Sequence, residues 1–439
     1  MNTEFVVIGG GAAGLTAAYD LQQAGRSVEL LEASPRTGGV IASKQVEGFD
    51  LDLGPNSLLL TPSLGDRIRS LGLDVLEAAS VSKNRYLVRD KTLHALSPHP
   101  LKLMKSPYLS WAAKGRILTE RFRPRGGGEE EQSVGAFFSR RFGNEISAAV
   151  VDPIFSGIYA GDIDRLSLDH VLPVAGRWER EYGSVIRGLM KQKDALKGGR
   201  TIINLKGGLQ SLMDALATPL GAHVHTNATV TGIRRDGGRF VVTHTRGVVE
   251  ADHVVYAAPL GASGLAASGP DGATVLDGIP PVEYTSVRTL HVTVPQEALE
   301  LPPGFGFLVP SRECLALMGC IFTSSIFPAK APAGAVLLTV MMGGAHKGTE
   351  LLERPGTLEA AALADLRDIL RIRGDLRVLH GHTWMGAIPQ KNLGHARVLE
   401  ALESYERAHP GFRFAGSAVS GISVGDTMEY AAKVVHSMT

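Results

Sequence analysis

The chain begins with an apolar run that changes abruptly into a glycine-rich turn and then into a helical pattern. Residues 5–8 (FVVI) are all apolar, and glycines follow at Gly9, Gly11 and Gly14. The segment 15–25 (LTAAYDLQQAG) then has helical character, and a second apolar stretch, 27–33 (SVELLEA), carries Glu32 near its end. The pattern therefore predicts a strand, a tight turn, a helix and a second strand.

This arrangement is typical of a dinucleotide-binding turn. Gly9 permits the tight turn, Gly11 lets the backbone approach a pyrophosphate, and Gly14 lets the helix pack close to the strand. Glu32 follows at about the spacing expected for an acid that bonds the ribose hydroxyls. This stretch predicts that a dinucleotide binds, but it leaves open which dinucleotide.

The pattern along the rest of the chain predicts several regions of different character. Strand and helix alternate up to about Leu76, segments 134–162 and 185–196 are rich in helix, and 223–259 reads as short strands with glycine turns. Segment 260–380 mixes strands with a helix at 357–372, and 413–435 reads as strand, loop and helix. We expect an α/β fold (α+β overall): a discontinuous Rossmann-like nucleotide-binding domain, a mixed-sheet substrate domain and a helical insertion. The predicted boundaries are 1–80, 200–265 and 380–439 for the nucleotide-binding domain, 81–199 for the helical domain and 266–379 for the substrate domain.

Composition narrows the class of protein. The chain has 439 residues, 44% of them hydrophobic, which is enough for a large core, and its net charge of +1 gives no reason to expect a nucleic-acid partner. Cys314 and Cys320 are too far apart on one strand for a disulfide, so we expect two buried small hydrophobes and a reducing, cytoplasmic compartment. We find no metal-binding pattern and no apolar run long enough to cross a bilayer.

One basic segment departs from this neutral average. Residues 83–125 hold eleven Lys or Arg against Asp90 and Glu120. One interpretation is a surface that lies on anionic lipid, with Leu109, Trp111, Leu118 and Phe122 entering the interface. The alternative is an ordinary solvated helical face whose apolar residues belong to the core.

Further motifs extend the dinucleotide signal. The stretch ASPRTGG follows Glu32, VVYAAP ends at Pro259, and GISVGD ends at Asp426 just before a helix. Together with the first turn, these resemble the flavin amine oxidase and protoporphyrinogen oxidase superfamily, which implies FAD as the cofactor. The resemblance assigns these residues to FAD: Gly9, Gly10, Gly11, Ala12, Ala13, Gly14, Glu32, Ala33, Arg36, Gly38, Gly39, Gly54, Pro55, Asn56, Ser57, Val230, Trp384, Ile422, Ser423, Val424, Gly425 and Asp426.

Smaller motifs are similar to those of the protoporphyrinogen oxidase family within that superfamily. They are spread over nearly the whole chain: GPNS, NRYLVRDKTLHALSP, SGIYAGD, GFGFLVP, MGCIFTSSIFP, TVMMGG and WMGAIPQKNLGH. The resemblance implies a substrate site made of Arg85, Gly157, Leu308, Ile321 and Met341. A guanidinium at Arg85 suits a propionate carboxylate, and the apolar residues suit a tetrapyrrole.

The reaction implied by the resemblance is oxidation of protoporphyrinogen IX to protoporphyrin IX in heme biosynthesis, with O₂ reduced to hydrogen peroxide. We assign no catalytic side chain, because the flavin carries the redox chemistry. The main alternative is oxidation of coproporphyrinogen III; an amine oxidase, a carotenoid desaturase and a porphyrin-binding flavoprotein without turnover are further ones. The predicted partners are the porphyrinogen, O₂, an anionic membrane surface on the cytoplasmic side and a ferrochelatase, and a homodimer is left open.

Overall fold

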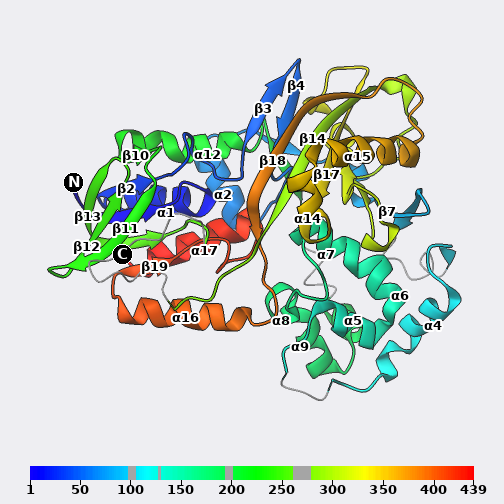
Figure 1. Ribbon diagram of the computed structural model, residues 1–439, viewed down its shortest axis with the longest axis horizontal. Coiled ribbons are helices and arrows are strands. Elements are labelled where there is room, and N and C mark those ends of the chain that lie inside the picture. The colour runs from blue at the N-terminus through cyan, green and yellow to red at the C-terminus, as the bar shows by residue number, and fades with distance from the viewer. Residues whose placement is uncertain (97–104, 127–129, 193–200, 261–277) are drawn as a thin grey trace.

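The computed structural model describes residues 1–96, 105–126, 130–192, 201–260 and 278–439. Lys102 of the predicted basic segment and the predicted domain boundaries at 199/200 and 265/266 lie outside these ranges. The chain forms two large sheets and a group of helices beside the second sheet, and both termini lie on the side of the first sheet (Figure 1).

The first sheet joins segments that are far apart in the sequence. Its seven strands are β1 (Asn2–Ile8), β2 (Val28–Leu31), β10 (Val224–His225), β11 (Val230–Asp236), β12 (Arg239–His244), β13 (Gly247–Tyr256) and β19 (Phe412–Phe414). Strands β10, β2, β1, β13 and β19 pair in parallel, whereas β11, β12 and β13 form an antiparallel meander. The predicted discontinuous Rossmann-like fold is confirmed, since β19 near the chain end pairs with the second half of β13.

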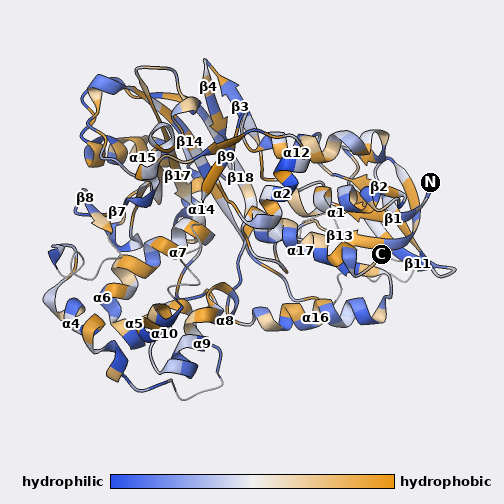
Figure 2. Cartoon of the chain, turned by 180° about the vertical axis from the view of Figure 1, so that it is seen from behind, coloured by the Kyte–Doolittle hydropathy of each residue, from blue (hydrophilic) through white to orange (hydrophobic). Residues whose placement is uncertain are grey.

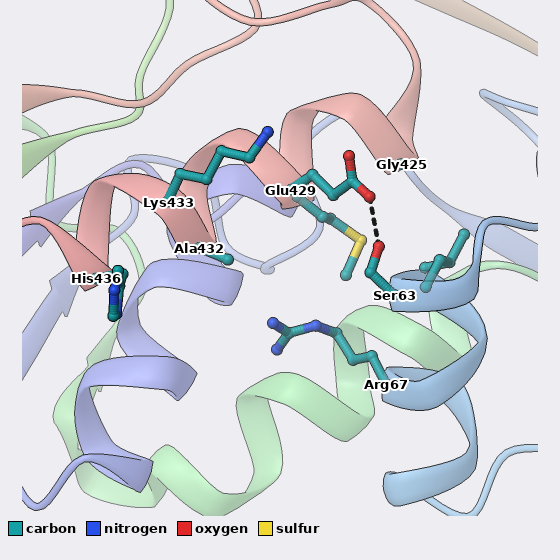
Figure 3. A pocket seen from close by; sticks show the side chains of 9 residues that line it. Ser63, Arg67, Gly425, Glu429, Ala432, Lys433 and His436 are labelled. Carbon is teal, nitrogen blue, oxygen red and sulfur yellow. Dashed lines mark hydrogen bonds between the residues drawn. The ribbon is translucent and has the colours of Figure 1, made fainter.

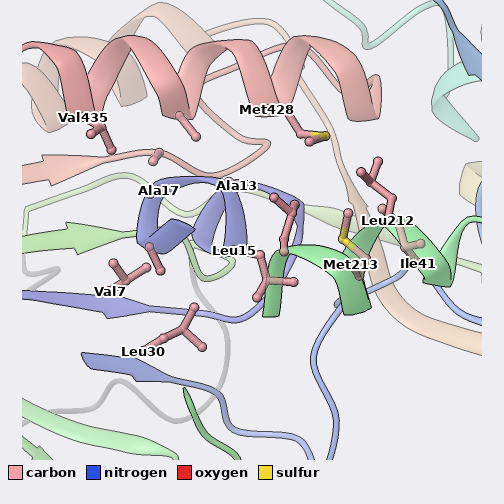
Figure 4. Packing of buried hydrophobic residues seen from close by; sticks show 14 of the residues in the cluster. Val7, Ala13, Leu15, Ala17, Leu30, Ile41, Leu212, Met213, Met428 and Val435 are labelled. Atoms are coloured by element: carbon pink, nitrogen blue, oxygen red, sulfur yellow. The ribbon is translucent and has the colours of Figure 1, made fainter. Parts of the chain in front are cut away.

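Helices α1 (Ala12–Gln23), α17 (Val424–His436) and α12 (Gln210–Ala217) build the core on one face of this sheet. Helix α1 packs against α17 (Figure 4). Both helices bury small side chains in the shared core, among them Ala17 and Ala431, which lets the helices lie close together. Helix α12 contributes Leu212 and Met213 to the same core. Helix α16 (His395–Ala408) packs Val398 and Leu402 into the other hydrophobic core of the first sheet. Hydrophobic and hydrophilic stripes alternate along this helix (Figure 2), because only one of its faces is buried.

The second sheet is mixed and contains residues from three predicted regions. In spatial order its strands are β18 (Arg377–Pro389), β14 (Tyr284–Pro295), β17 (Ala335–Gly343), β16 (Gly319–Ile321), β15 (Gly306–Leu308), β7 (Arg85–Arg89) and β8 (Thr92–Leu96). Only β15 and β7 pair in parallel. Strand pairing thus crosses the predicted boundaries: β7 and β8 come from the range 81–199, and most of β18 comes from 380–439.

Two smaller sheets connect the large ones. Strands β3 (Ser43–Val46) and β4 (Phe49–Asp52) form a hairpin, and β5 (Leu58–Leu59), β9 (Ile202–Leu205) and β6 (Val75–Glu77) form a three-stranded sheet. Helix α2 (Pro62–Ser70) follows β5, with Thr61 as its N-cap. On its far face, the second sheet packs against α14 (Gly344–Glu353) and α15 (Pro355–Leu370), the helix predicted at 357–372.

The remaining helices build the predicted helical insertion. They are α4 (Trp111–Thr119), α5 (Val134–Phe142), α6 (Asn144–Ile146), α7 (Asp152–Tyr159), α8 (Leu168–Val171), α9 (Pro173–Tyr182) and α10 (Val185–Lys191). Their apolar residues form a core of their own, which also contacts Leu87 and Leu308 of the second sheet.

Candidate cofactor and substrate site

The glycine turn has the close geometry expected from its sequence. Gly9 has a φ of +100°, which favours glycine, and its N–H donates to the Leu31 carbonyl at 2.8 Å. A Cβ atom on Gly14 would overlap the carbonyl oxygen of Gly9. Helix α1 therefore begins directly at the end of β1, with its first N–H groups at the sheet edge.

A second glycine pair packs against this turn. The Gly38 N–H donates to the Gly10 carbonyl at 2.7 Å, and a Cβ atom on Gly39 would lie 3.1 Å from the Cα of Gly11. The Glu32 carboxylate accepts a hydrogen bond from the Gly10 N–H at 2.6 Å. Glu32 and the two glycine motifs were predicted from separate stretches, and they contact one another in the structure. The glycines there pack so closely that side chains in their place would clash.

Arg36 holds the second glycine turn in shape. Its guanidinium donates to the carbonyl oxygens of Gly39 and Ile41 and lies 5.4 Å from the centre of the Trp384 ring. Burial lowers the pKa of Arg36, and the nearby Glu32 carboxylate opposes that shift. The structure thus gives Arg36 a local role in the loop, and its direct contact with FAD stays a prediction.

The segment predicted to contact adenine runs beside Glu32. The Ala228 N–H donates to the Glu32 carbonyl at 2.8 Å, and the Asn227 N–H donates to the Ser34 carbonyl at 3.0 Å. Val230 begins β11 two residues later and is buried.

The C-terminal motif returns to the same edge. The Ala415 N–H donates to the Tyr256 carbonyl at 2.8 Å, and a Cβ atom on Gly9 would lie 2.8 Å from the backbone nitrogen of Ala258. Ser423 caps α17 by accepting a hydrogen bond from the Asp426 N–H at 3.1 Å. Two helix N-termini, of α1 and α17, therefore lie at one edge of the first sheet, where each favours negative charge.

Three of the predicted substrate residues lie on one face of the second sheet. Residues that pair across strands share a face, as do residues two apart on a strand. Leu308 pairs with Gly319, and Gly319 pairs with Met341. Ile321 lies two residues beyond Gly319, so Leu308, Ile321 and Met341 share that face.

Register adds Arg85 to the same face. Leu87 pairs in parallel with Leu308, and Arg85 lies two residues before Leu87 on β7. The guanidinium of Arg85 stacks 5.1 Å from the centre of the Phe305 ring. Partial burial of the guanidinium lowers the pKa of Arg85, although the residue as a whole stays exposed. Arg85 makes no ion pair with any residue that the structure describes.

Gly157 and Trp384 extend this face in opposite directions. A Cβ atom on Gly157 of α7 would lie 2.6 Å from Leu308 Cδ2, so the glycine allows the helix to touch the predicted apolar wall. At the other end, Met341 pairs with Thr289 and Thr289 with His382, two residues before Trp384. The Trp384 Nε1–H donates to the Leu53 carbonyl at 2.9 Å, next to the predicted cofactor loop 54–57.

The comparisons with known proteins agree with this geometry. Residues 12–433 match the model of a family described as flavin containing amine oxidoreductase. The chain belongs to this family. A protoporphyrinogen oxidase from Homo sapiens is 32% identical over 98% of the chain and 97% of the relative. A coproporphyrinogen III oxidase from Bacillus subtilis (strain 168) is 28% identical over 97% and 95%. A solved structure from Exiguobacterium sp. 255-15 has a TM-score of 0.84 at 24% identity, and covers 99% of the chain and 98% of that structure.

Membership of this flavin family identifies FAD as the cofactor and confirms the predicted resemblance. The residues fit the group, because the glycine-lined surface, the acid at Glu32 and the two helix N-termini suit a dinucleotide. FAD supplies a two-electron acceptor when bound. The individual FAD contacts stay predictions.

A buried charge beneath the cofactor loop was not predicted from the sequence. The carboxylate of Asp52, at the end of β4, accepts hydrogen bonds from Lys330 Nζ at 2.5 Å and Asn204 Nδ2 at 2.7 Å. It also accepts from the Ser43 hydroxyl and the Leu209 N–H. A lone acid in the stretch FDLDLGPN gives no sequence signal for such a centre.

Neighbouring backbone carbonyls on this segment are also bound. The His291 Nε2–H donates to the Asp52 carbonyl at 2.9 Å, and the Thr289 hydroxyl donates to the Leu53 carbonyl at 2.9 Å. Burial lowers the pKa of His291 to about 4, so its ring is neutral at pH 7. The loop 54–57 is therefore anchored from both the small sheets and the second sheet.

The structure corrects one part of the membrane interpretation and one expectation about the cysteines. The membrane interpretation has Leu109 entering the lipid interface, but Leu109 is only 3% exposed and packs in the helical core with Tyr108, as the alternative interpretation predicts. Cys314 was expected to be buried, but it is exposed in a turn, while Cys320 is buried as expected. In the part of the chain that the structure describes, no helix meets the length and hydropathy of a membrane span, and no group of side chains suits a metal ion.

A groove of about 440 Å³ lies between α2 and α17 (Figure 3). None of the predicted substrate residues lines it. Arg67, Lys433 and His436 line it, together with Glu429, which accepts a hydrogen bond from Ser63. Arg67 is already paired in a bidentate way with Asp20. Of the predicted FAD residues, only Gly425 reaches this groove.

Proposed function

We propose that the protein is an FAD-dependent porphyrinogen oxidase that converts protoporphyrinogen IX to protoporphyrin IX, with O₂ as the final acceptor and hydrogen peroxide as its product. The main supporting observation is that Arg85, Leu308, Ile321 and Met341 share one face of the second sheet. At the other end of this face, Trp384 donates a hydrogen bond to the Leu53 carbonyl, next to the predicted cofactor loop 54–57. The names of the relatives supply the reaction class.

In this proposal the chain itself binds, orients and shields the substrate. The apolar residues on the sheet face contact the macrocycle, and Gly157 lets α7 approach without a side chain between them. The close fit excludes water and holds a bridging carbon toward the cofactor loop. Conversion of a porphyrinogen to a porphyrin removes six electrons, so a two-electron acceptor must be reduced and reoxidised three times for each substrate molecule.

Arg85 supplies the cation for a propionate carboxylate. Its guanidinium is preorganised by the Phe305 ring, and its donors are not consumed by an ion pair within the described residues. A planar fork of N–H donors suits a carboxylate in a bidentate way.

Coproporphyrinogen III is the alternative substrate. The Bacillus subtilis relative is named for it and covers the chain as fully as the protoporphyrinogen oxidases do. That substrate carries four carboxylates, so it would use cations beyond Arg85. The arginine in NRY favours protoporphyrinogen IX by resemblance.

An assay with both substrates tests this proposal. The FAD-loaded protein is mixed in air with protoporphyrinogen IX or coproporphyrinogen III, and porphyrin fluorescence and peroxide are followed together. Faster oxidation of protoporphyrinogen IX supports the proposal, and faster oxidation of coproporphyrinogen III selects the alternative. Binding without turnover, or turnover of amines alone, would reject both.

A charge reversal tests the role of Arg85. We expect Arg85→Glu to raise KM about 10- to 100-fold, because a charged hydrogen bond contributes roughly 1.5–3 kcal/mol, while FAD content stays at the wild-type value. The matched control is Arg407→Glu on the exposed face of α16, which should leave KM unchanged. Loss of FAD from Arg85→Glu would mean that the residue serves the cofactor instead.

We also propose that the helical insertion touches an anionic membrane surface. Trp111, Leu118 and Phe122 are 77%, 61% and 69% exposed. Trp111 and Leu118 lie seven residues apart on one side of α4, and Phe122 lies in the short 3-10 turn that follows this helix. Exposed Arg121 lies over the Phe122 ring, and Arg125 is exposed three residues after Phe122 in the sequence. An apolar stripe flanked by cations suits the headgroup region of anionic lipid. The cytoplasmic location, a ferrochelatase that receives the porphyrin and a homodimer remain predictions.

A further inference from the structure

Another buried lysine, Lys391, lies in the connection between β18 and α16. Lys391 is 8% exposed, and its Nζ donates a hydrogen bond to the carbonyl oxygen of Ser420. Within the described ranges, no carboxylate lies in ion-pair distance of this ammonium. Burial lowers the pKa of Lys391, and the carboxylate of Asp426 opposes the shift. A buried lysine is rare without a close counter-ion, so this charge calls for a physical reason.

The hydrogen-bond partner of Lys391, Ser420, comes directly before the predicted FAD motif 421–426 and begins the short loop 420–423 that leads into α17. In this loop the Gly421 carbonyl accepts a hydrogen bond from the Thr427 hydroxyl at 2.9 Å, and Ser423 caps α17. The Gly421 backbone is packed so tightly that a Cβ atom there would lie 2.6 Å from an Asp426 carboxylate oxygen. By binding the Ser420 carbonyl, Lys391 fixes the first peptide of this loop and so the direction of the N–H groups that follow.

The same connection is also attached to the helical insertion. The Ser167 N–H donates to the Lys391 carbonyl at 2.9 Å, and the Leu393 N–H donates to the Arg165 carbonyl at 2.8 Å. The Gln390 side chain donates to the Tyr159 carbonyl at 2.9 Å, at the end of the helix that contains Gly157. One short segment therefore contacts both the FAD loop and the helices beside the predicted substrate face.

We propose that Lys391 is a positioning residue for the FAD site: it holds the loop 420–423 through the Ser420 carbonyl and adds a buried positive charge near the N-terminus of α17. A positive charge near a bound flavin favours its reduced form, which carries more negative charge. Lys391 therefore both tightens FAD binding and raises the midpoint potential of the bound FAD. The inference rests on the cofactor and not on the porphyrinogen activity, so it can fail while that proposal stands.

Lys391→Met tests the two effects together, because it keeps the length of the side chain and removes the charge and the hydrogen bond. We expect the Kd for FAD to rise about tenfold. The midpoint potential, from a spectroscopic titration against a reference dye, should fall by about 30 mV, which is a tenfold change for a two-electron couple. The matched control is Lys433→Met, at the exposed end of the same α17, where both values should stay at wild type.

Two further variants separate the hydrogen bond from the charge. Lys391→Gln keeps a donor for the Ser420 carbonyl, so its Kd for FAD should lie near wild type while its midpoint potential still falls. Lys391→Arg keeps the charge and should restore most of the potential. A wild-type potential in Lys391→Gln, or the same loss in Lys391→Arg and Lys391→Met, would overturn the inference. Lys391→Gln also decides the matter should Lys391→Met fail to fold.

Discussion

Two buried ion pairs stabilise different parts of the molecule in different ways. Beneath the cofactor loop, Lys330 and Asp52 pair with side-chain exposures of 1% and 2%. In the helical insertion, Arg141 and Glu120 pair with both side chains fully buried. Each burial costs several kcal/mol per ion unless partners satisfy the charge.

The partners differ in where they come from. The Asp52 carboxylate collects donors from β3, β9, the start of α12 and the turn at Lys330, so segments up to 278 residues apart meet on one acid. Arg141 instead donates within one region, to Glu120, to Glu179 and to the Gly183 carbonyl. Ser184 also donates to Glu120.

This difference predicts two kinds of failure. The Asp52 centre joins the two small sheets to the start of α12 and to the turn at Lys330, next to the loop 54–57, so its loss should affect the whole fold and the cofactor together. The Arg141 centre joins neighbouring helices, so its loss should stay inside the helical insertion.

The largest effect is expected from Asp52→Ala. Four donors lose their acceptor and Lys330 becomes a buried, unpaired charge, which should lower the free energy of unfolding by about 3–5 kcal/mol or more. FAD retention should fall with it, measured by flavin absorbance after gel filtration. The control is Asp50→Ala on the same strand, where only Gln45 loses a partner and the change should stay within about 0.5 kcal/mol. A stable, yellow Asp52→Ala protein would remove the basis of the comparison.

The cofactor edge could be predicted from the sequence because its signals are local. A glycine turn, an acid about twenty residues later and a second glycine pair each fix the backbone within a few residues, and Gly9, Glu32 and Gly39 indeed meet. The return of β19 to β13 was predicted only through a motif, GISVGD, since β19 itself spans three residues.

The substrate face and the buried charges depend on long-range pairing, which a local pattern does not carry. Strands β7 and β8 were assigned to the helical domain because the surrounding segment is basic, yet β7 pairs with β15 more than 200 residues later. Asp52, Lys330 and Lys391 are ordinary polar residues in the sequence, and only the packing of distant segments buries them. The same limit applies to Leu109. The membrane interpretation grouped it with Trp111, two residues away, but only Trp111 is exposed.

The second prediction tests whether loss of the Arg141–Glu120 pair destabilises only the helical insertion. In Arg141→Met, Glu120 becomes an unpaired buried charge, so the helices around it should be destabilised by about 3 kcal/mol. Hydrogen exchange should rise in α5, α9 and α10 but not in the first sheet, and FAD should be retained. Arg177→Met, on the exposed side of α9, serves as the control. Loss of FAD together with the helices would show that the two regions unfold as one unit.

As the pH falls, the region around Asp52 and His291 should lose stability before the helical insertion does. The pKa of buried His291 is lowered from 6.5 to about 4, so between these values the unfolded chain binds a proton that the folded chain excludes, and stability falls as the pH falls. Hydrogen bonds from Arg140 and Gly126 hold the pKa of Glu179 below 4.5, against the opposing effect of burial, so its contribution is lost only below that pH.

We therefore expect FAD release, followed by flavin fluorescence, to begin at higher pH than the loss of helical circular dichroism. His395, with a pKa also near 4, shares the window of His291, so His291→Gln should reduce the pH dependence of FAD release without abolishing it. Helix loss that precedes FAD release would reverse the proposed order.

The smallest effect on stability is expected from the exposed stripe of the helical insertion. Trp111, Leu118 and Phe122 contribute nothing to the Arg141 centre, so changing all three to Ser should alter the free energy of unfolding by only about 0.5 kcal/mol per site. The same variant should lose co-sedimentation with vesicles containing anionic phosphatidylserine at low salt. The control replaces exposed Leu352 and Val378, which lie in other parts of the molecule, with Ser and should sediment like wild type. Wild-type protein that stays in the supernatant with these vesicles would reject the membrane surface while leaving the role of the Arg141 centre intact.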